Sequence, residues 1–104
     1  MCPTKPSTSP QPATARLFPL GHIVATPPAL SVLQTHGIQP LTLLQRHVIG
    51  DWGDLDPEDV QANTDALAHG WRLFSSYVIA EGVKVWIITE ADRSVTTLLM
   101  PDDY

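Results

Sequence analysis

The sequence predicts an α+β fold: a short N-terminal strand, three helices, and then a three-stranded antiparallel meander with the helices packed on one face of the sheet. Two observations lead to this class. Three stretches between residues 26 and 70 begin at proline and end at glycine, as helices do. After Trp71 the apolar residues follow the period of extended strands, with tight turns between them.

Residues 1–16 are expected to form a disordered arm rich in Pro, Ser and Thr, and residues 17–104 a single α+β domain. The arm has no large apolar side chain to offset the entropy of ordering, and it lacks the apolar stretch of a secretory signal. No later segment resembles a membrane span. We therefore expect a cytoplasmic protein with no membrane partner. Cys2, the only cysteine, lies in the arm, which excludes a disulfide within the chain.

The charge balance argues against a duplex DNA partner. The chain has a net charge of −5 and eleven acidic residues, all of them beyond the arm. Binding to duplex DNA depends on neutralising phosphates, and the basic side chains beyond residue 16 are few and scattered. They are Arg46, Arg72, Lys84 and Arg93. A local cationic pocket is still compatible with this composition.

The first elements are a short strand over residues 21–25 and a helix that follows it directly. Thr26 is a good N-cap, and Pro27 suits the first helical position because its missing N–H would be unpaired there. The helix is expected to run to about His36 and to stop at Gly37.

Two further helices are predicted before the meander. The second begins at Pro40 and ends at Gly50, and its expected apolar stripe is Leu41, Leu44 and Val48. The third begins after the cap at Asp56 and ends near Gly70. Its expected inner stripe contains Val60 and Leu67, with Asn63 and Thr64 between them.

The meander consists of strands over residues 71–80, 84–90 and 94–100. A two-residue loop at Glu81 and Gly82 would place Ala80 opposite Val83, Val78 opposite Val85, and Tyr77 opposite Trp86. This register assigns to the core a face made of Phe74, Val78, Val83, Val85 and Ile87. The opposite face, called the mixed face because it carries both apolar and polar side chains, consists of Leu73, Ser75, Tyr77, Ile79, Lys84, Trp86, Ile88 and Glu90.

The last strand has two possible registers. With a two-residue loop Arg93 lies opposite Glu90, and Thr97 joins the mixed face. With a three-residue loop Ser94 and Thr96 take those places, because a slip of one residue inverts a strand.

The mixed face is one candidate site. Lys84, Glu90, Arg93, Tyr77 and Thr97 could together hold an anion such as a phosphodiester and supply acid–base groups. The alternative is an ordinary solvated face on which Glu90 and Arg93 pair across strands and Trp86 packs against Tyr77.

The loop after the second helix is another candidate site. His47, Asp51 and Asp54 lie close in sequence to Trp52, as a catalytic base or a metal ligand set would require; their spacing matches no metal signature. Alternatively, His47 ends a helix, Trp52 fills the core and Gly53 permits the turn. The common phosphate-binding, dinucleotide and nucleophile motifs are absent from the sequence, so neither a metal nor a cofactor is expected.

Three stretches carry a family resemblance: LFPLGHIVATPPAL, HVIGDWGDLDPEDVQAN and KVWIITEADRSVTTLLMPDDY. They resemble small proteins of proteobacterial plasmids and integrative conjugative elements, labelled plasmid-related protein or type I restriction endonuclease subunit M. A modification subunit needs a cofactor-binding α/β domain and an Asn-Pro-Pro-aromatic loop, and this chain has neither. The resemblance thus implies a mobile-element setting and no particular reaction.

A second resemblance is at the level of the fold. Ribonucleases of the barnase, EndoU, colicin and RelE-like types also place helices before an antiparallel sheet, and they cleave RNA without a metal from the exposed sheet face. The roles that this resemblance implies are phosphate binding by Lys84 and Arg93, general-base action by Glu90 or His47, and ribose positioning by Thr97 or Tyr77.

The function predicted from the sequence is protein–protein interaction by an accessory protein of a mobile element, regulatory or anti-defence in kind. The expected surfaces are the acidic loop at residues 51–59 and the aromatic sheet face, since aromatic residues suit interfaces. The binding residues would be Asp51, Trp52, Asp54, Tyr77 and Trp86. The alternative is a metal-independent ribonuclease, and only under this alternative is RNA expected as a partner. A third possibility is a nucleic-acid mimic, in which the acidic side chains would stand in for phosphates. The sequence does not indicate an oligomeric state.

Overall fold

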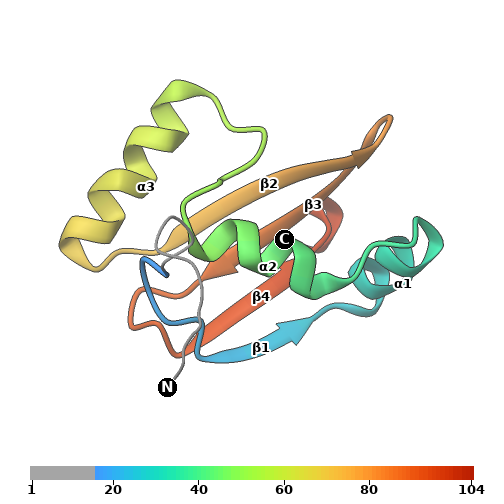
Figure 1. Ribbon diagram of the computed structural model, residues 1–104, viewed down its shortest axis with the longest axis horizontal. Coiled ribbons are helices and arrows are strands. Elements are labelled where there is room, and N and C mark those ends of the chain that lie inside the picture. The colour runs from blue at the N-terminus through green and yellow to red at the C-terminus, as the bar shows by residue number, and fades with distance from the viewer. Residues whose placement is uncertain (1–15) are drawn as a thin grey trace, which may run out of the picture.

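The structure, a computed structural model, describes residues 16–104. The expected N-terminal arm therefore lies, except for Arg16, outside the described residues. The element order is β1 (His22–Ala25), α1 (Pro27–Thr35), α2 (Pro40–Val48), α3 (Pro57–His69), β2 (Leu73–Ala80), β3 (Val83–Thr89), β4 (Val95–Leu99) and the 3-10 turn η3 (Pro101–Asp103). The predicted α+β class is confirmed (Figure 1). No helix within residues 16–104 has the length and apolar character needed to cross a bilayer.

The helices begin where the sequence predicts. Thr26 caps α1 by accepting a hydrogen bond from the N–H of Ala29, and Asp56 caps α3 by accepting one from Asp59. Each of the three helices has proline in its first turn, and α3 ends at Gly70 in the left-handed conformation. Local capping chemistry thus decides these boundaries.

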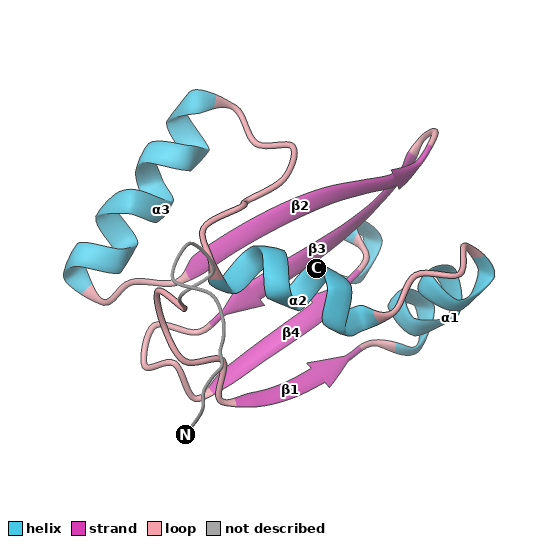
Figure 2. Cartoon of the chain, viewed as in Figure 1, coloured by secondary structure: helices cyan, strands magenta, loops and turns pink. Residues whose placement is uncertain are grey.

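The sheet is mixed, with strand order β1-β4-β3-β2. Strands β2, β3 and β4 form the predicted antiparallel meander, whereas β1 joins its open edge parallel to β4 (Figure 2). In this pairing His22 lies beside Val95. No turn in the sequence links β1 to the meander, so the direction of this strand could not be predicted locally. It depends on where the helices return the chain.

A β-bulge changes the predicted register of the first hairpin. Ala80 lies opposite Val83 as expected, but the pairing shifts between Val78 and Ala80, so that Val78 faces Lys84 and Tyr77 faces Val85. The extra residue in β2 inverts the faces of that strand beyond the bulge. The predicted opposition of Tyr77 to Trp86 is therefore wrong.

The core face changes accordingly. Leu73, Ser75 and Tyr77, which the sequence placed on the mixed face, are buried beside the helices, while Val78, predicted to be in the core, is 50 % exposed. Phe74, the other residue of β2 assigned to the core, joins Val78 on the opposite face, where its ring contacts Trp86. The assignment of Val85 and Ile87 to the core is confirmed.

The helices contribute to the core differently from the predicted stripes. In α2 the buried residues are Leu43, Leu44, His47 and Val48, whereas Leu41 is 56 % exposed. In α3 the buried residues are Asn63 and Ala66, and Val60 is 39 % exposed. Figure 1 shows that α2 crosses the sheet, whereas α3 lies beside the edge strand β2. The residues that α3 buries are accordingly small or polar.

The second hairpin has a longer loop than either prediction. The N–H of Glu90 donates to the carbonyl of Val95, and the turn between them consists of Ala91, Asp92, Arg93 and Ser94. Asp92 accepts hydrogen bonds from the backbone and hydroxyl of Ser94, which pulls the turn closed. Because the loop length is even, Thr97 lies opposite Ile88 on the mixed face, as it would with a two-residue loop.

Candidate functional site

The structure separates the residues of the predicted catalytic site. Lys84 lies on β3 near the first hairpin, where its ammonium is 3.9 Å from the carboxylate of Asp54. Arg93 lies in the second hairpin turn, at the other end of the sheet, and His47 lies in the core. Of this set, Glu90 and Thr97 come together, at the lining of one small cavity.

Arg93 holds the β3–β4 turn against neighbouring backbone. Its guanidinium donates hydrogen bonds to the carbonyls of Trp71 at 2.6 Å, Glu90 at 3.1 Å, Ala91 at 3.1 Å and Ala66 at 3.2 Å. The backbone of Arg93 has a left-handed φ of 62°, which is uncommon outside glycine. The cross-strand pair predicted between Arg93 and the carboxylate of Glu90 is not formed.

A small cavity of about 190 Å³ on the face opposite α2 gathers four polar side chains: Arg72, Glu90, Thr97 and Tyr104. The guanidinium of Arg72 lies 3.5 Å from the Glu90 carboxylate and donates to the Tyr104 hydroxyl at 3.1 Å. Glu90 and Thr97 thus meet, but with Arg72 and Tyr104 in place of Lys84 and Arg93. The correct hairpin register would have indicated Arg72; nothing in the sequence indicated Tyr104.

His47 belongs to a buried polar network rather than to a surface loop. Its Nδ1 pairs with the Ser75 hydroxyl and its Nε2 with the Thr89 hydroxyl, at 2.5 and 2.9 Å. The network continues from Thr89 to Thr96 at 2.8 Å, and Thr96 donates to the carbonyl of Leu20 at 2.7 Å. The sequence did not indicate Ser75, Thr89 or Thr96 as partners of His47, because the predicted β2 register pointed Ser75 away.

The direction of the protons in this network follows from its last bond. The Thr96 hydroxyl donates its proton to the Leu20 carbonyl, so it accepts a hydrogen bond from the Thr89 hydroxyl. Because the Thr89 hydroxyl has only this one proton to donate, it accepts from the Nε2–H of His47. Nδ1 of His47 accepts from Ser75. With a neutral imidazole, each hydroxyl and each ring nitrogen of this network has a hydrogen-bond partner.

The environment of His47 favours this neutral form. Burial, and secondly the positive charge of Arg93, lower the pKa of His47 to about 4. His47 and Ser75 have no solvent exposure, so this Ser–His pair cannot reach a substrate in the described conformation. His47 lies in the last turn of α2, as expected, but the expectation that it acts there as a favourable cation is wrong, since the side chain lies in the core and is uncharged at neutral pH.

Each predicted binding residue in the loop after α2 makes a structural contact. Asp51 forms an ion pair with Arg46 at 2.7 Å, and this hydrogen bond lowers the pKa of the Asp51 carboxyl. Its backbone carbonyl accepts a hydrogen bond from the buried Tyr77 hydroxyl at 2.6 Å. Burial raises the pKa of Tyr77 to about 12. The N–H of Asp54 donates to the Ser76 carbonyl at 2.6 Å, while the Asp54 carboxylate is well exposed.

The aromatic surface predicted for binding is largely internal. Trp52 and Tyr77 are buried, which confirms the alternative that Trp52 fills the core while Gly53 makes the turn. Trp86 is half-buried between the rings of Phe74 and Tyr104. The predicted contact of Trp86 with Tyr77 is absent because the two side chains occupy opposite faces of the sheet.

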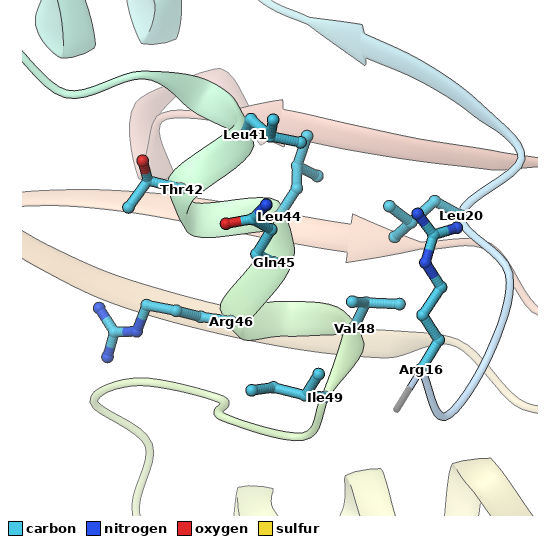
Figure 3. Close-up of a pocket in the computed structure, with 9 residues that line it drawn as sticks. All are labelled: Arg16, Leu20, Leu41, Thr42, Leu44, Gln45, Arg46, Val48 and Ile49. Atoms are coloured by element: carbon cyan, nitrogen blue, oxygen red, sulfur yellow. The ribbon is translucent and has the colours of Figure 1, made fainter. Parts of the chain in front are cut away.

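A larger groove, of about 550 Å³, lies between α2 and the segment that precedes β1. Figure 3 shows its lining residues: Arg16, Leu20, Leu41, Thr42, Leu44, Gln45, Arg46, Val48 and Ile49. Leu44 and Val48 are buried at its floor, and Leu41 is exposed. The sequence did not predict this groove, because it assigned Leu41 to the core.

Within residues 16–104 no three His, Cys, Asp or Glu side chains gather closely enough to hold a metal ion. Comparison of the chain with protein-family models, with curated proteins and with solved structures gives no match.

Proposed function

We propose that this protein acts by binding another protein, as an accessory protein of a mobile genetic element, and that the groove beside α2 receives the partner. The observation that carries the proposal is the composition of this groove. Its floor is aliphatic, Leu41 stands exposed at its rim, and none of its lining residues is acidic although the chain has a net charge of −5.

The chemistry of the groove specifies a kind of partner. Grooves lined by aliphatic side chains take the apolar face of a helix or strand, and Arg16 at the rim favours acidic residues beside that face. We therefore expect an amphipathic, acidic segment of the partner protein. The mobile-element setting rests on the sequence resemblance alone.

Site-specific photocrosslinking tests the groove. A photoreactive residue in place of Gln45, which lines the groove, is expected to give a discrete adduct in cells of the host. The matched control replaces Gln61, which is exposed on α3. Leu41→Asp should remove the Gln45 adduct, since a carboxylate at the apolar rim opposes burial. Equal adducts from both positions, or an adduct that persists in Leu41→Asp, would refute the proposal.

The ribonuclease alternative is favoured by one observation, the convergence of Arg72, Glu90, Thr97 and Tyr104 around the small cavity on the opposite face. A carboxylate beside a cation and two hydroxyls has the residue types of metal-free RNA cleavage. Under this alternative Arg72 would hold the phosphate and Glu90 would act as the base.

Cleavage of RNA by the purified protein in the presence of EDTA tests this alternative. Glu90→Gln should abolish cleavage, while Glu81→Gln, on the exposed first hairpin, should not change it. Arg93→Ala is a poor test, because it removes the hydrogen bonds that hold the turn. Harmless expression of the wild-type protein together with intact RNA in vitro would exclude the activity.

A further inference from the structure

The sheet has two edge strands, and the described part of the chain covers only one of them. On β2, the Asn63 amide binds both backbone groups of Phe74, and Ser76 exchanges hydrogen bonds with the backbone of Trp52 and Asp54. Strand β1, at the other edge, has no such cover among residues 16–104 (Figure 1). It also lacks the lysine, proline or bulge with which proteins usually block an edge.

The backbone of β1 offers a defined set of free groups. The N–H groups of His22 and Thr26 point inward and donate to the carbonyls of Ser94 and Leu98, both at 2.9 Å. Because the pairing groups of a strand in a parallel ladder alternate, those of the intervening residues Ile23 and Ala25 point away from β4. Ile23 and Val24, between these inward-pointing positions, are 50 % and 47 % exposed.

We propose that two copies of the chain associate by antiparallel pairing of their β1 strands about a two-fold axis at Val24. In this register Ile23 lies opposite Ala25 of the second copy, and each such pair exchanges both backbone hydrogen bonds. Val24 then lies opposite Val24 of the second copy in a non-hydrogen-bonded position, where side chains are closest. Every outward backbone group of Ile23 and Ala25 finds a partner.

The side-chain directions agree with this symmetry. Ile23 and Ala25 lie beside Thr96 and Leu98, which are buried on the face that α2 covers, and Val24 points to the opposite face with Thr97. Directly opposite residues of an antiparallel pair share a face. The proposed register therefore forms one continuous sheet with the helices of both copies on the same side, as a two-fold axis perpendicular to the sheet requires.

Polar complementarity at the ends of the strand selects a second copy as the occupant. In the same register His22 lies opposite Thr26 of the second copy, whose hydroxyl donates to the Asp103 carboxylate at 2.7 Å. The imidazole of each copy thus faces a carboxylate of the other, and the two-fold axis repeats the pair. The edge itself has no acidic residue, so the net charge of −5 on each chain is not concentrated where the copies meet.

Sedimentation of the purified full-length protein tests the association. The wild-type protein is expected to be dimeric at about 100 μM, and Val24→Glu should weaken dimerisation at least about tenfold, because two carboxylates would face each other across the axis. Val78→Glu is the matched control, since Val78 is equally exposed on the other edge strand, and it should leave the dimer intact. A monomeric wild-type protein, or a dimer broken by Val78→Glu instead, would overturn the proposal.

Disulfide formation tests the register. In a Cys2→Ser background, Val24→Cys should form a disulfide-linked dimer on mild oxidation, because opposed non-hydrogen-bonded positions have Cα separations that a disulfide spans. Ile23→Cys and Val78→Cys should form little disulfide-linked dimer, since neither introduced cysteine lies opposite its own copy. Equal cross-linking of all three variants would mean random collision and would contradict the two-fold axis at Val24.

The contact between His22 and Asp103 has its own test. His22→Asp should weaken dimerisation, because a carboxylate would face Asp103, whereas His22→Lys, which places an ammonium opposite Asp103, should retain it. The reverse order would contradict the pairing. This inference goes beyond the proposed function and can fail separately from it. Leu41→Asp should prevent the groove adduct without changing the dimer. Val24→Glu should weaken the dimer without changing the groove adduct.

Discussion

At the scale of single residues, the unusual feature is a buried histidine whose two ring nitrogens both pair with hydroxyl groups. His47 accepts from Ser75 and donates to Thr89, an arrangement that satisfies both ring nitrogens of a neutral ring. A protonated imidazole would present a second N–H to the Ser75 hydroxyl in a site without solvent exposure. The folded state therefore disfavours the proton that the unfolded chain binds readily.

This histidine makes the stability of the protein depend on pH. The pKa of His47 falls from 6.5 in the unfolded chain to about 4 in the folded protein, so the unfolded state binds more protons between these values. The contribution is fully present above about pH 6.5 and is lost as the pH falls towards 4, at a cost of about 3 kcal/mol in the free energy of unfolding.

Urea unfolding between pH 8 and pH 4 measures this loss. His47→Gln should lower stability at pH 7 and flatten the decline between pH 6.5 and 4. His36→Gln is the control, because His36 is exposed at the end of α1 and its replacement should leave the decline unchanged. A decline of the same size in His47→Gln would mean that other groups, such as the Asp51 carboxyl of the Arg46 ion pair, cause it.

At the scale of elements, α3 is attached to the sheet through the backbone of an edge strand. The Asn63 amide donates to the Phe74 carbonyl at 2.6 Å and accepts from the Phe74 N–H at 3.1 Å, so it acts as a short substitute for a neighbouring strand. Asn63 is 3 % exposed, and Ala66 is its buried neighbour on the same helix. The Asn63 amide lies within the buried stripe of α3 because it pairs with the otherwise free backbone groups of the edge strand β2.

Asn63→Ala is expected to lower the free energy of unfolding by about 1–3 kcal/mol, because two backbone groups of Phe74 lose their partner. Amide hydrogen exchange should show faster exchange at Phe74 but not at Ser76, whose N–H donates to the Trp52 carbonyl. Gln61→Ala, on the exposed face of the same helix, should change stability by less than about 0.5 kcal/mol. Unchanged protection at Phe74 in Asn63→Ala would show that the amide does not cover this edge.

At the scale of the whole molecule, the sheet combines local and distant pairings. β2, β3 and β4 are joined by short turns, whereas β1 pairs with β4 near the other end of the chain. Closing a long loop costs chain entropy before any contact is gained, so distant pairings form late. We therefore expect the meander to form in the folding transition state and β1 to join after it.

Folding and unfolding rates in urea distinguish the two stages. Ile87→Val, in the central strand β3, should mainly slow folding, whereas Ala25→Gly, in β1, should mainly accelerate unfolding. Each substitution should change stability by about 1 kcal/mol, which is enough for a reliable ratio. If Ala25→Gly slowed folding as much as Ile87→Val, β1 would already be paired in the transition state.

The sequence by itself determined the features that depend on neighbouring residues: the α+β class, the caps and prolines that begin the helices, the glycines that end them, and the core positions Val85 and Ile87 in β3. Tertiary structure alone decided the bulge in β2, the parallel pairing of β1, the exposure of Leu41 and the burial of His47 and Tyr77. One extra residue in a strand inverts its faces at little local cost, so packing of the whole sheet against α2 selects the register. The candidate sites followed that register, which is why Glu90 meets Arg72 while Lys84 and Arg93 lie at opposite ends of the sheet.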